Sequence, residues 1–316
     1  MRVGNKNILI TGATGFIGSN ITRRFVQLGA RVSIFIRKDS LLWRIEDIKN
    51  EVTINTVDLL NCYQLKKTIS AIRPDIIIHN AVYGGYTFQK DWKKIFNTNF
   101  TGTVNLLNAC ERFGFALFIN TGSSSEYGVK KIPMKETDIL EPVSAYGVAK
   151  AAVSLYCLAR AKNDALPITT LRLFSPYGYY EDKTRLIPSV IISVLKNKSP
   201  RLSSPRNVRD FIFIEDVVEA YRKTVENSDK LKGEILNIGS GRQHTVSDVV
   251  EKIAEIEGKP LTPVWDAVTN SRFEPENWQA NISKAKRLLN WSPKHDLREG
   301  LRKSIQWFKR NTNLYA

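Results

Sequence analysis

Asn7-Ile8-Leu9-Ile10-Thr11-Gly12-Ala13-Thr14-Gly15-Phe16-Ile17-Gly18 is the stretch of this chain that decides its fold. The stretch begins with an apolar strand pattern, continues with three glycines and is followed by an apolar pattern with helical spacing. Three glycines at intervals of three permit a tight turn, a close approach of ligand to backbone and close packing of helix on strand. The first N–H groups of such a helix attract phosphates. We therefore predict a dinucleotide-binding turn formed by Gly12, Thr14, Gly15, Phe16, Ile17 and Gly18.

Short apolar strands alternate with helical patterns from this turn up to residue 174. The predicted strands cover residues 6–11, 31–36, 52–57, 75–79, 115–120 and 168–174. The predicted helices cover residues 15–28, 61–72, 91–113 and 146–163. This alternation is typical of a parallel sheet with both faces covered. We expect a Rossmann-type doubly wound α/β fold.

The alternation of strand and helix patterns ends after residue 174, and prolines occur in the following segments, which we expect to be irregular. A strand at 235–238 and helices at 246–257, 283–289 and 297–309 are still predicted. We assign residues 1–174 to the dinucleotide-binding domain, to which some later segments return. Residues 175–316 are assigned mainly to a smaller C-terminal α/β lobe that covers the ligand-binding ends of the strands.

Bulk composition excludes several classes of protein. The 316 residues carry a net charge of +16, but the basic residues are spread along the chain, so no nucleic-acid partner is expected. Such a positive field would steer an anionic ligand equally well. No apolar stretch reaches the roughly 18 residues of a membrane span, and no secretory signal is recognised, so we expect a cytoplasmic protein. We predict that the three cysteines are buried free thiols. The three histidines do not have the spacing of metal ligands, so no metal site is predicted.

The residues after the second predicted strand bear on the choice of cofactor. An NAD-binding protein usually places an acidic residue there, on the ribose 2′-hydroxyl. Arg37 and Lys38 would instead attract a 2′-phosphate, so NADP(H) is favoured, and Asp39 keeps NAD(H) possible. Asp58 and Leu59, after the third strand, are expected at the adenine, although Asp58 is also a candidate helix N-cap.

Tyr146 and Lys150 lie one helical turn apart and share a face. A phenol with a pKa of about 10 is a poor acid or base at neutral pH, but a nearby ammonium lowers that pKa. Tyr146 can then exchange the proton of a carbinol while hydride moves to or from a nicotinamide. A hydroxyl of the three serines at 123–125, behind the fifth predicted strand, is a candidate for a hydrogen bond to the reacting oxygen, although at least one of the three only makes a turn.

Taken in order, these motifs resemble an extended short-chain dehydrogenase/reductase of the NAD-dependent epimerase/dehydratase family, along nearly the whole chain. The resemblance rests on residues 11–18, 58–59, 79–81, 97–103, 120–128, 146 with 150, 172–178, 208–212 with 216, and 288–293. It implies a nucleotide-diphosphate sugar bound between the lobes, with C4 facing the nicotinamide. Tyr146 would then be the acid/base, and Lys150 would also hold the nicotinamide ribose. Ser123 would polarise the C4 oxygen, with Ser124 as second choice.

The resemblance also implies binding residues and an assembly. The cofactor would further contact Asn80, Ala81 and Asn99. The substrate would contact Ser125, Ser175, Arg185, Arg209 and Arg272, where Arg209 and Arg272 match positions that grip the diphosphate. A surface ion pair is the alternative role for each arginine. A homodimer through the helices near 91–113 and 146–162 is typical of the family.

Departures from the family pattern narrow the activity. Family dehydratases follow their catalytic Thr with acidic residues, whereas this chain has Ser124 and Ser125 there and Glu126 one position late. Ser175 stands where many epimerases carry Asn. The sequence around Ser175 resembles that of reductases that act on nucleotide-linked 4-keto-6-deoxyhexoses. We therefore expect such a reductase. A 4-epimerase with tightly bound NAD is the first alternative, and a non-catalytic cofactor-sensing protein is the second. The nucleotide and the sugar stay open.

Overall fold

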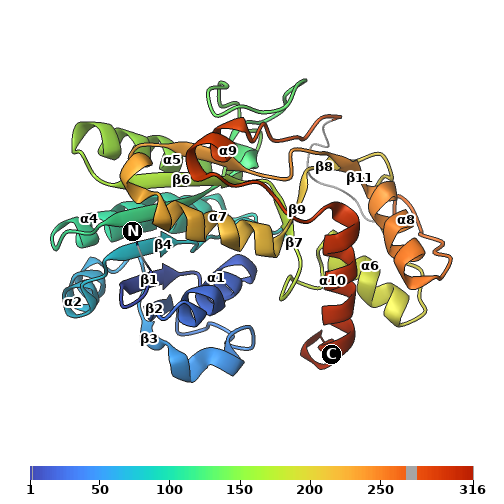
Figure 1. The fold of residues 1–316 in the computed structure, drawn as a ribbon, viewed down its shortest axis with the longest axis horizontal. Coiled ribbons are helices and arrows are strands. Elements are labelled where there is room, and N and C mark those ends of the chain that lie inside the picture. Colours follow the sequence, from blue (N-terminus) through green and yellow to red (C-terminus); the bar gives the residue numbers. More distant parts are fainter. Residues whose placement is uncertain (2, 268–275, 316) are drawn as a thin grey trace.

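A seven-stranded parallel sheet with helices on both faces forms the larger part of the molecule, and a smaller lobe stands beside it (Figure 1). The structure is a computed structural model that describes residues 1, 3–267 and 276–315. The α/β fold class predicted from the sequence is confirmed.

The sheet has the strand order β10-β6-β5-β4-β1-β2-β3. Its strands are β1 (Asn7–Thr11), β2 (Arg31–Ile36), β3 (Thr53–Thr56), β4 (Ile76–His79), β5 (Leu117–Ser123), β6 (Ile168–Leu173) and β10 (Ile235–Ile238). The chain runs outward from β1 to β3 and then crosses to β4 on the other side of β1. Sheets of this kind bind ligands at such a switch point, outside the carboxyl ends of the strands.

Two helical layers cover the sheet, because side chains of one strand alternate between its faces. Ile8 and Ile10 enter one apolar core with α1 (Phe16–Gln27) and α7 (Ile214–Glu226). Leu9 enters the other core. That second layer consists of α2 (Cys62–Ile72), α4 (Gly102–Glu111) and α5 (Ala145–Asn163). The short helices are η1 (Glu46–Glu51), η3 (Ser124–Glu126), η4 (Ser228–Lys230), η5 (Thr312–Tyr315) and α9 (Ser283–Leu289), which lies beside β10.

The single helix predicted over 91–113 is divided by one wide turn. It consists of α3 (Trp92–Phe96), the π-helical turn η2 (Asn97–Thr101) and α4. Turns of this kind often occur at functional sites. Here the wide turn carries Asn99, whose buried side chain is directed at the loop after β4.

The smaller lobe is built from short strand pairs and three helices. β7 (Ser175–Tyr177) pairs with β9 (Phe211–Phe213), and β8 (Val208–Arg209) pairs with β11 (His244–Thr245). The helices are α6 (Leu186–Leu195), α8 (Val246–Glu257) and α10 (Leu297–Arg310), and α10 packs against both others. In Figure 1 this lobe lies on the side of the sheet opposite to the N-terminus.

The expectation of irregular structure between residues 175 and 234 is wrong for two helices, α6 and α7. Pro188 is the third residue of α6, where the missing N–H has no intrahelical partner to lose. α7 follows β9 directly and packs on α1. β10 then pairs with β6 and completes the sheet. Proline content alone was therefore a poor guide to this region.

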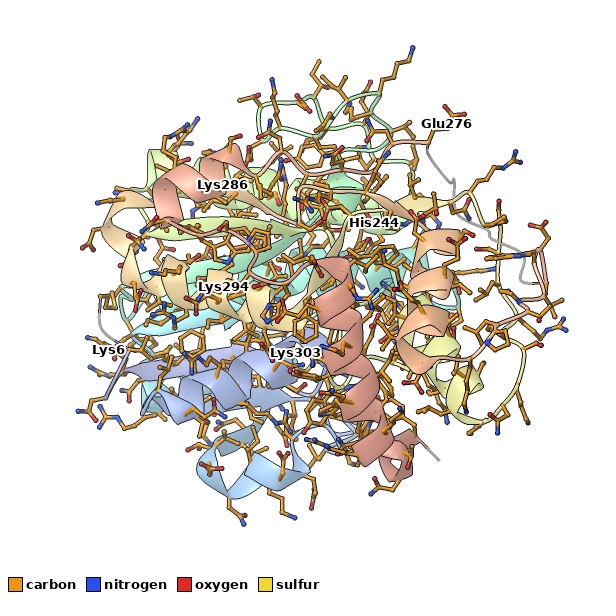
Figure 2. The ribbon with its side chains drawn as sticks, turned by 45° about the vertical axis from the view of Figure 1, so that its right-hand side comes forward. Lys6, His244, Glu276, Lys286, Lys294 and Lys303 are labelled. Carbon is orange, nitrogen blue, oxygen red and sulfur yellow. The ribbon has the colours of Figure 1, made fainter. Side chains whose placement is uncertain are left out.

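The basic side chains come from many separate elements. Figure 2 shows Lys6 before β1, Lys286 on α9, Lys294 in the segment before α10 and Lys303 on α10. No helix among the described residues is long and apolar enough to cross a membrane.

Candidate active site

The glycine turn between β1 and α1 leaves no room for side chains. Gly12 has a φ of 68°, and a Cβ on it would lie 2.6 Å from the carbonyl carbon of Asn80. A Cβ on Gly18 would lie 2.1 Å from the carbonyl oxygen of Gly12. Gly15 is the N-cap of α1, and no side chain caps that helix. Bare N–H groups at a helix N-terminus suit a diphosphate, so the turn fits the dinucleotide that the sequence predicts.

The other predicted residues of this turn, Thr14, Phe16 and Ile17, are partly exposed around it. The carbonyl oxygen of Thr14 accepts a 3.4 Å hydrogen bond from Nη1 of Arg44. Nε of Arg44 also donates to the carbonyl oxygen of Tyr180 at 2.7 Å. Arg44 therefore links the glycine turn to the loop that leads into α6.

The cations at the end of β2 are exposed, and one of them is paired. Nε of Arg37 lies 3.3 Å from the carboxylate of Asp39, and its backbone N–H donates to Oγ of Ser40. Lys38 is exposed. Asp39 thus offsets part of the positive charge on which the NADP(H) expectation depends.

Asp58 and Leu59 lie between β3 and α2. Asp58 is exposed, and its Oδ1 accepts the N–H of Leu60 at 2.9 Å. Asn61 is the N-cap of α2, so the alternative role of Asp58 as a cap is wrong. Leu59 is half-buried beside Gly102 of α4.

The loop after β4 is held from two sides. The N–H of Ala81 donates to Oγ1 of Thr11 at 3.2 Å. Asn99 binds both backbone groups of Tyr83, accepting its N–H at 2.9 Å and donating to its carbonyl at 2.8 Å. Asn80 stands between these anchors, against Gly12. The side chain of Asn99 therefore shapes the loop, while Asn80 and Ala81 lie beside the glycine turn.

Tyr146 and Lys150 lie in the first turns of α5, which Ser144 caps by accepting the N–H of Gly147 at 3.0 Å. Lys150 is 5% exposed, and its Nζ donates to the carbonyl oxygen of Thr121 in β5. Burial lowers the pKa of this ammonium, and the carboxylate of Glu126 opposes that shift. The ring of Tyr146 is half-buried beside Gly84. The structure thus brings the predicted acid/base pair to the carboxyl end of the sheet.

The serine loop follows β5, which runs three residues further than predicted and ends at Ser123. Oγ of Ser123 accepts the N–H of Ser125 at 3.1 Å, and Ser123 caps η3. Oγ of Ser124 accepts Nε1–H of Trp278 at 3.1 Å. Ser123 and Ser124 are buried, whereas Ser125 is partly exposed.

Glu126 is the carboxylate nearest to these serines in the sequence, and it is committed elsewhere. It is fully buried and lies 2.7 Å from Nε of Arg172, which is also buried. Its Oε1 accepts the N–H of Ser123, and Nη1 of Arg172 donates to the hydroxyl of Tyr127 at 2.9 Å. The ion pair holds the serine loop in place, and Glu126 is therefore not available as a free acid.

Apart from Ser125 in η3, the candidate substrate residues come from the smaller lobe and are less firmly held. Ser175 starts β7 and is half-buried. Arg185 lies 3.9 Å from Glu181, and its guanidinium faces the ring of Tyr86 at 5.8 Å. The guanidinium of Arg209 lies 5.7 Å from the Trp278 ring, and its Nη1 donates to the carbonyl of Val208. Arg272 lies outside the described residues.

Three residues at the site were not found by sequence reasoning. Thr121 binds Lys150 through its carbonyl oxygen. Tyr221 of α7 reaches Thr121 from the opposite layer, and Trp278 reaches Ser124. Tyr221 and Trp278 lie 100 and 154 residues from their partners, and Tyr221, an aromatic residue on an apolar helix face, is predicted from sequence only as a core residue.

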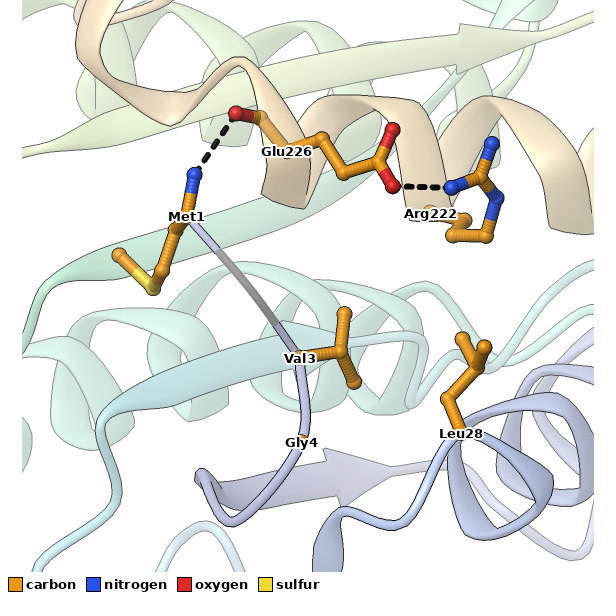
Figure 3. A pocket seen from close by; sticks show the side chains of 6 residues that line it. All are labelled: Met1, Val3, Gly4, Leu28, Arg222 and Glu226. Carbon is orange, nitrogen blue, oxygen red and sulfur yellow. Dashed lines mark hydrogen bonds and ion pairs between the residues drawn. The ribbon is translucent and has the colours of Figure 1, made fainter.

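One cavity of about 450 Å³ lies at the amino end of β1, away from the acid/base pair. Met1, Val3, Gly4, Leu28, Arg222 and Glu226 line it (Figure 3). Its polar groups bind each other, since the Met1 ammonium donates to the carbonyl of Glu226 and Arg222 pairs with the Glu226 carboxylate. Among the described residues, no group of three or more His, Cys, Asp and Glu side chains could hold a metal ion.

Comparison with known proteins matches residues 8–239 to the model of the NAD dependent epimerase/dehydratase family. A Bacillus subtilis (strain 168) protein named as the uncharacterized UDP-glucose epimerase YtcB is 29% identical over 95% of this chain and 97% of its own. The Bacillus cereus UDP-glucuronic acid 4-epimerase, solved with UDP-glucuronic acid and NAD, is 28% identical with a TM-score of 0.86 and covers 96% and 99% of the two chains. The Bacillus anthracis dTDP-glucose 4,6-dehydratase, solved with NAD, is 26% identical with a TM-score of 0.87 and 97% coverage of each chain.

Proposed function

Because the chain belongs to the NAD-dependent epimerase/dehydratase family, we propose that it is a nucleotide-sugar 4-epimerase that works with bound NAD. The chain is an enzyme of the NAD-dependent nucleotide-sugar type, since it matches such enzymes along nearly its whole length. The finer assignment, epimerisation at C4, is supported by the Bacillus cereus protein, which is named as a 4-epimerase, and by the Bacillus subtilis protein, which is named as an epimerase.

One observation in the site carries this proposal. Lys150 lies one helical turn from Tyr146 and donates to the carbonyl oxygen of Thr121. The neighbouring loop carries serine hydroxyls, and the one acidic residue in this loop, Glu126, is paired with Arg172. Epimerisation at C4 requires proton exchange at a single oxygen. Elimination of water requires an additional acid for the leaving hydroxyl, and Glu126 is not free for it.

A nicotinamide bound here would accept hydride from C4 and return it to the other face of the carbonyl. The phenol oxygen of Tyr146 takes the proton of the C4 hydroxyl and later gives it back. The ammonium of Lys150 stabilises the phenolate form, because an opposite charge nearby favours ionisation. The hydroxyl of Ser123, or of Ser124, donates a hydrogen bond to the C4 oxygen. Arg209 pairs with the diphosphate, and Arg185, Ser125 and Ser175 make further contacts to the substrate.

We propose NAD as the cofactor rather than the NADP(H) that the sequence favours. Arg37 is paired with Asp39, and both solved structures described above hold NAD. The glycine turn, Asp58, Leu59 and the loop containing Asn80 and Ala81 would hold it, and Asn99 would keep that loop in place. Equilibrium binding of NAD⁺ and NADP⁺ tests the choice, and tighter binding of NADP⁺ would overturn it.

A reductase of nucleotide-linked 4-keto-6-deoxyhexoses is the second candidate, because Lys38 is exposed next to Arg37 and would add positive charge to a 2′-phosphate site. The test incubates the protein with UDP-glucose, UDP-glucuronate or dTDP-glucose and a catalytic amount of NAD⁺, and follows the products by NMR. We expect the C4 epimer of one substrate without net NADH. A 4-keto-6-deoxy product would indicate a dehydratase. Stoichiometric use of NADPH with a 4-keto sugar would indicate the reductase, and binding without turnover would indicate a cofactor-sensing protein.

Tyr146→Phe provides the matched chemical control for that assay. Loss of the acid/base group should lower kcat by about 10²–10⁴-fold. Tyr156→Phe, which removes a phenol hydroxyl from the same helix, should leave kcat unchanged. Equal activity of the two variants would remove Tyr146 from the mechanism.

We also propose a homodimer that buries the outward faces of α3, α4 and α5. Leu155 of α5 is 53% exposed and Trp92 of α3 is 61% exposed. Exposed apolar side chains grouped on adjacent helices are typical of an association surface. Light scattering after chromatography should give twice the chain mass, and Leu155→Glu should shift it to the monomer.

A further inference from the structure

A buried hydrogen-bonded cluster joins α7 to the carboxyl ends of β4 and β5. Oγ1 of Thr121 lies 2.6 Å from Oδ1 of Asn80 and 2.6 Å from the hydroxyl of Tyr221. The Tyr221 hydroxyl also lies 3.2 Å from Oδ1 of Asn80. Tyr221 is fully buried, and burial raises the pKa of its phenol, so it stays a neutral donor at neutral pH.

The two hydroxyls determine how the amide of Asn80 is turned. Each hydroxyl has one hydrogen, and one of these spans the contact between Thr121 and Tyr221. The other hydrogen is available to the amide, and the structure turns Oδ1 of Asn80 toward both hydroxyls as its acceptor. The nitrogen, Nδ2, consequently faces away from both. A chain of hydroxyls that ends on an amide oxygen polarises the amide and strengthens its N–H donors.

Nδ2 of Asn80 is buried and has no hydrogen-bond partner among the described residues. A buried donor without an acceptor is unfavourable, so such a group in a native structure needs an explanation. The donor is therefore suited to an acceptor oxygen that a ligand brings.

The position of Asn80 indicates which part of a ligand that is. Its backbone lies against Gly12 of the phosphate-binding turn, while Thr121 contacts Asn80 with its hydroxyl and Lys150 with its carbonyl. The amide thus stands between the phosphate turn and the acid/base pair. A dinucleotide that spans those two points must carry its second phosphate and second ribose past Asn80.

We propose that Thr121 and Tyr221 are positioning residues that direct Nδ2 of Asn80 at an oxygen of the nicotinamide-mononucleotide half of the cofactor. This inference rests on the proposed function, since it requires a dinucleotide in the glycine turn. It assigns a role in cofactor binding to a side chain of α7, a helix that otherwise serves the apolar core.

The experiment measures equilibrium dissociation constants of NAD⁺, ADP-ribose and AMP by calorimetry. Tyr221→Phe removes one hydroxyl, and Asn80→Asp keeps the shape and the acceptor but removes the donor. We expect Tyr221→Phe to raise the Kd of NAD⁺ and ADP-ribose about five- to tenfold and Asn80→Asp to raise it further. Binding of AMP, which lacks the second ribose and phosphate, should change less than twofold.

Thr224→Val is the matched control, because it removes a buried hydroxyl from α7 that donates to the carbonyl of Ala220 in the same helix. It should leave all three constants unchanged. Unchanged binding of NAD⁺ and ADP-ribose by Tyr221→Phe and Asn80→Asp would overturn this inference alone. Equal weakening of AMP would also overturn it, since that would indicate a distorted turn. A wild-type protein that binds none of the three compounds would overturn the proposed function as well.

Discussion

The glycine turn and the arginines of the smaller lobe are built in opposite ways. At Gly12 and Gly18 the backbone itself fills the space that any side chain would need. Arg185 instead has a 42% exposed side chain, 3.9 Å from Glu181. A site made by backbone packing permits one local sequence, whereas a site made by long side chains permits several. The first kind is therefore visible in a single sequence and the second is not.

The largest expected effect concerns the support beneath the serine loop, on the rigid side of this contrast. Arg172→Met leaves the buried carboxylate of Glu126 without its partner. We expect the free energy of unfolding to fall by about 3–5 kcal/mol, as measured by urea denaturation. Glu255→Gln breaks an exposed pair with Arg298 and should have no measurable effect. Similar stability of Arg172→Met and wild type would mean that the loop does not depend on this pair.

Gly18→Ala tests the glycine turn directly. Its Cβ would meet the Gly12 carbonyl, so α1 must shift away from β1. We expect a loss of about 2–3 kcal/mol in unfolding free energy and at least tenfold weaker NAD⁺ binding. Gly4→Ala, whose Cβ would meet only one atom at 3.8 Å, serves as the control. Normal NAD⁺ affinity in Gly18→Ala would show that the turn tolerates displacement.

For the arginines of the smaller lobe we expect a smaller effect, on the KM for the nucleotide sugar. If both arginines bind the substrate as proposed, Arg185→Gln and Arg209→Gln should each raise the KM for the nucleotide sugar about tenfold, because each removes a charge-assisted hydrogen bond. The kcat should stay within about twofold, and the Kd of NAD⁺ should not change. Arg298→Gln, which changes an exposed side chain of α10, is the charge-matched control. A change in kcat without a change in KM would place these arginines at the reacting atoms instead.

The same contrast explains what could be predicted from the sequence. The glycine turn, the strand rhythm and the Tyr146–Lys150 pair each depend on neighbours within a few residues, and the sheet and α5 stand where the pattern placed them. The commitment of Glu126 to Arg172 was not visible, because the partner is 46 residues away. Asn80 was assigned by motif alone, and the hydroxyls that turn its amide come from two other elements.

Cofactor choice shows a further limit of local patterns. The sequence favours NADP(H) through the cations Arg37 and Lys38 and keeps NAD(H) possible through Asp39, and in the structure Asp39 pairs with Arg37. The loop conformation that allows this includes the bond from the Arg37 N–H to Ser40. Charge counted along a sequence therefore overstates the charge that a 2′-phosphate would meet.

The smallest expected effect concerns pH and the carboxyl of Glu181, beside Arg185 at the edge between the lobes. Glu181 is 5% exposed, and its nearest partners are the N–H of Gly178 at 3.4 Å and Nε of Arg185 at 3.9 Å. Burial raises the pKa of this carboxyl from its usual 4.5 to about 8, against the opposing charge of Arg185. The folded protein thus keeps a proton that the unfolded chain releases above pH 4.5. The stability contributed by this group is full below pH 4.5 and is lost as the pH rises through 8.

Glu181→Gln removes that titration while keeping the shape of the side chain. Between pH 7 and pH 8 the free energy of unfolding of the variant, relative to wild type, should increase by about 1 kcal/mol, as followed by urea denaturation. Glu257→Gln replaces a side chain that is also buried but lies 2.8 Å from Lys309, and it should show no such increase. A constant difference between Glu181→Gln and wild type across this range would mean that Glu181 is already ionised at pH 7. Arg185 would then face an ionised carboxylate at neutral pH, as Arg172 does in its pair with Glu126. The contrast between the two regions would not extend to Arg185.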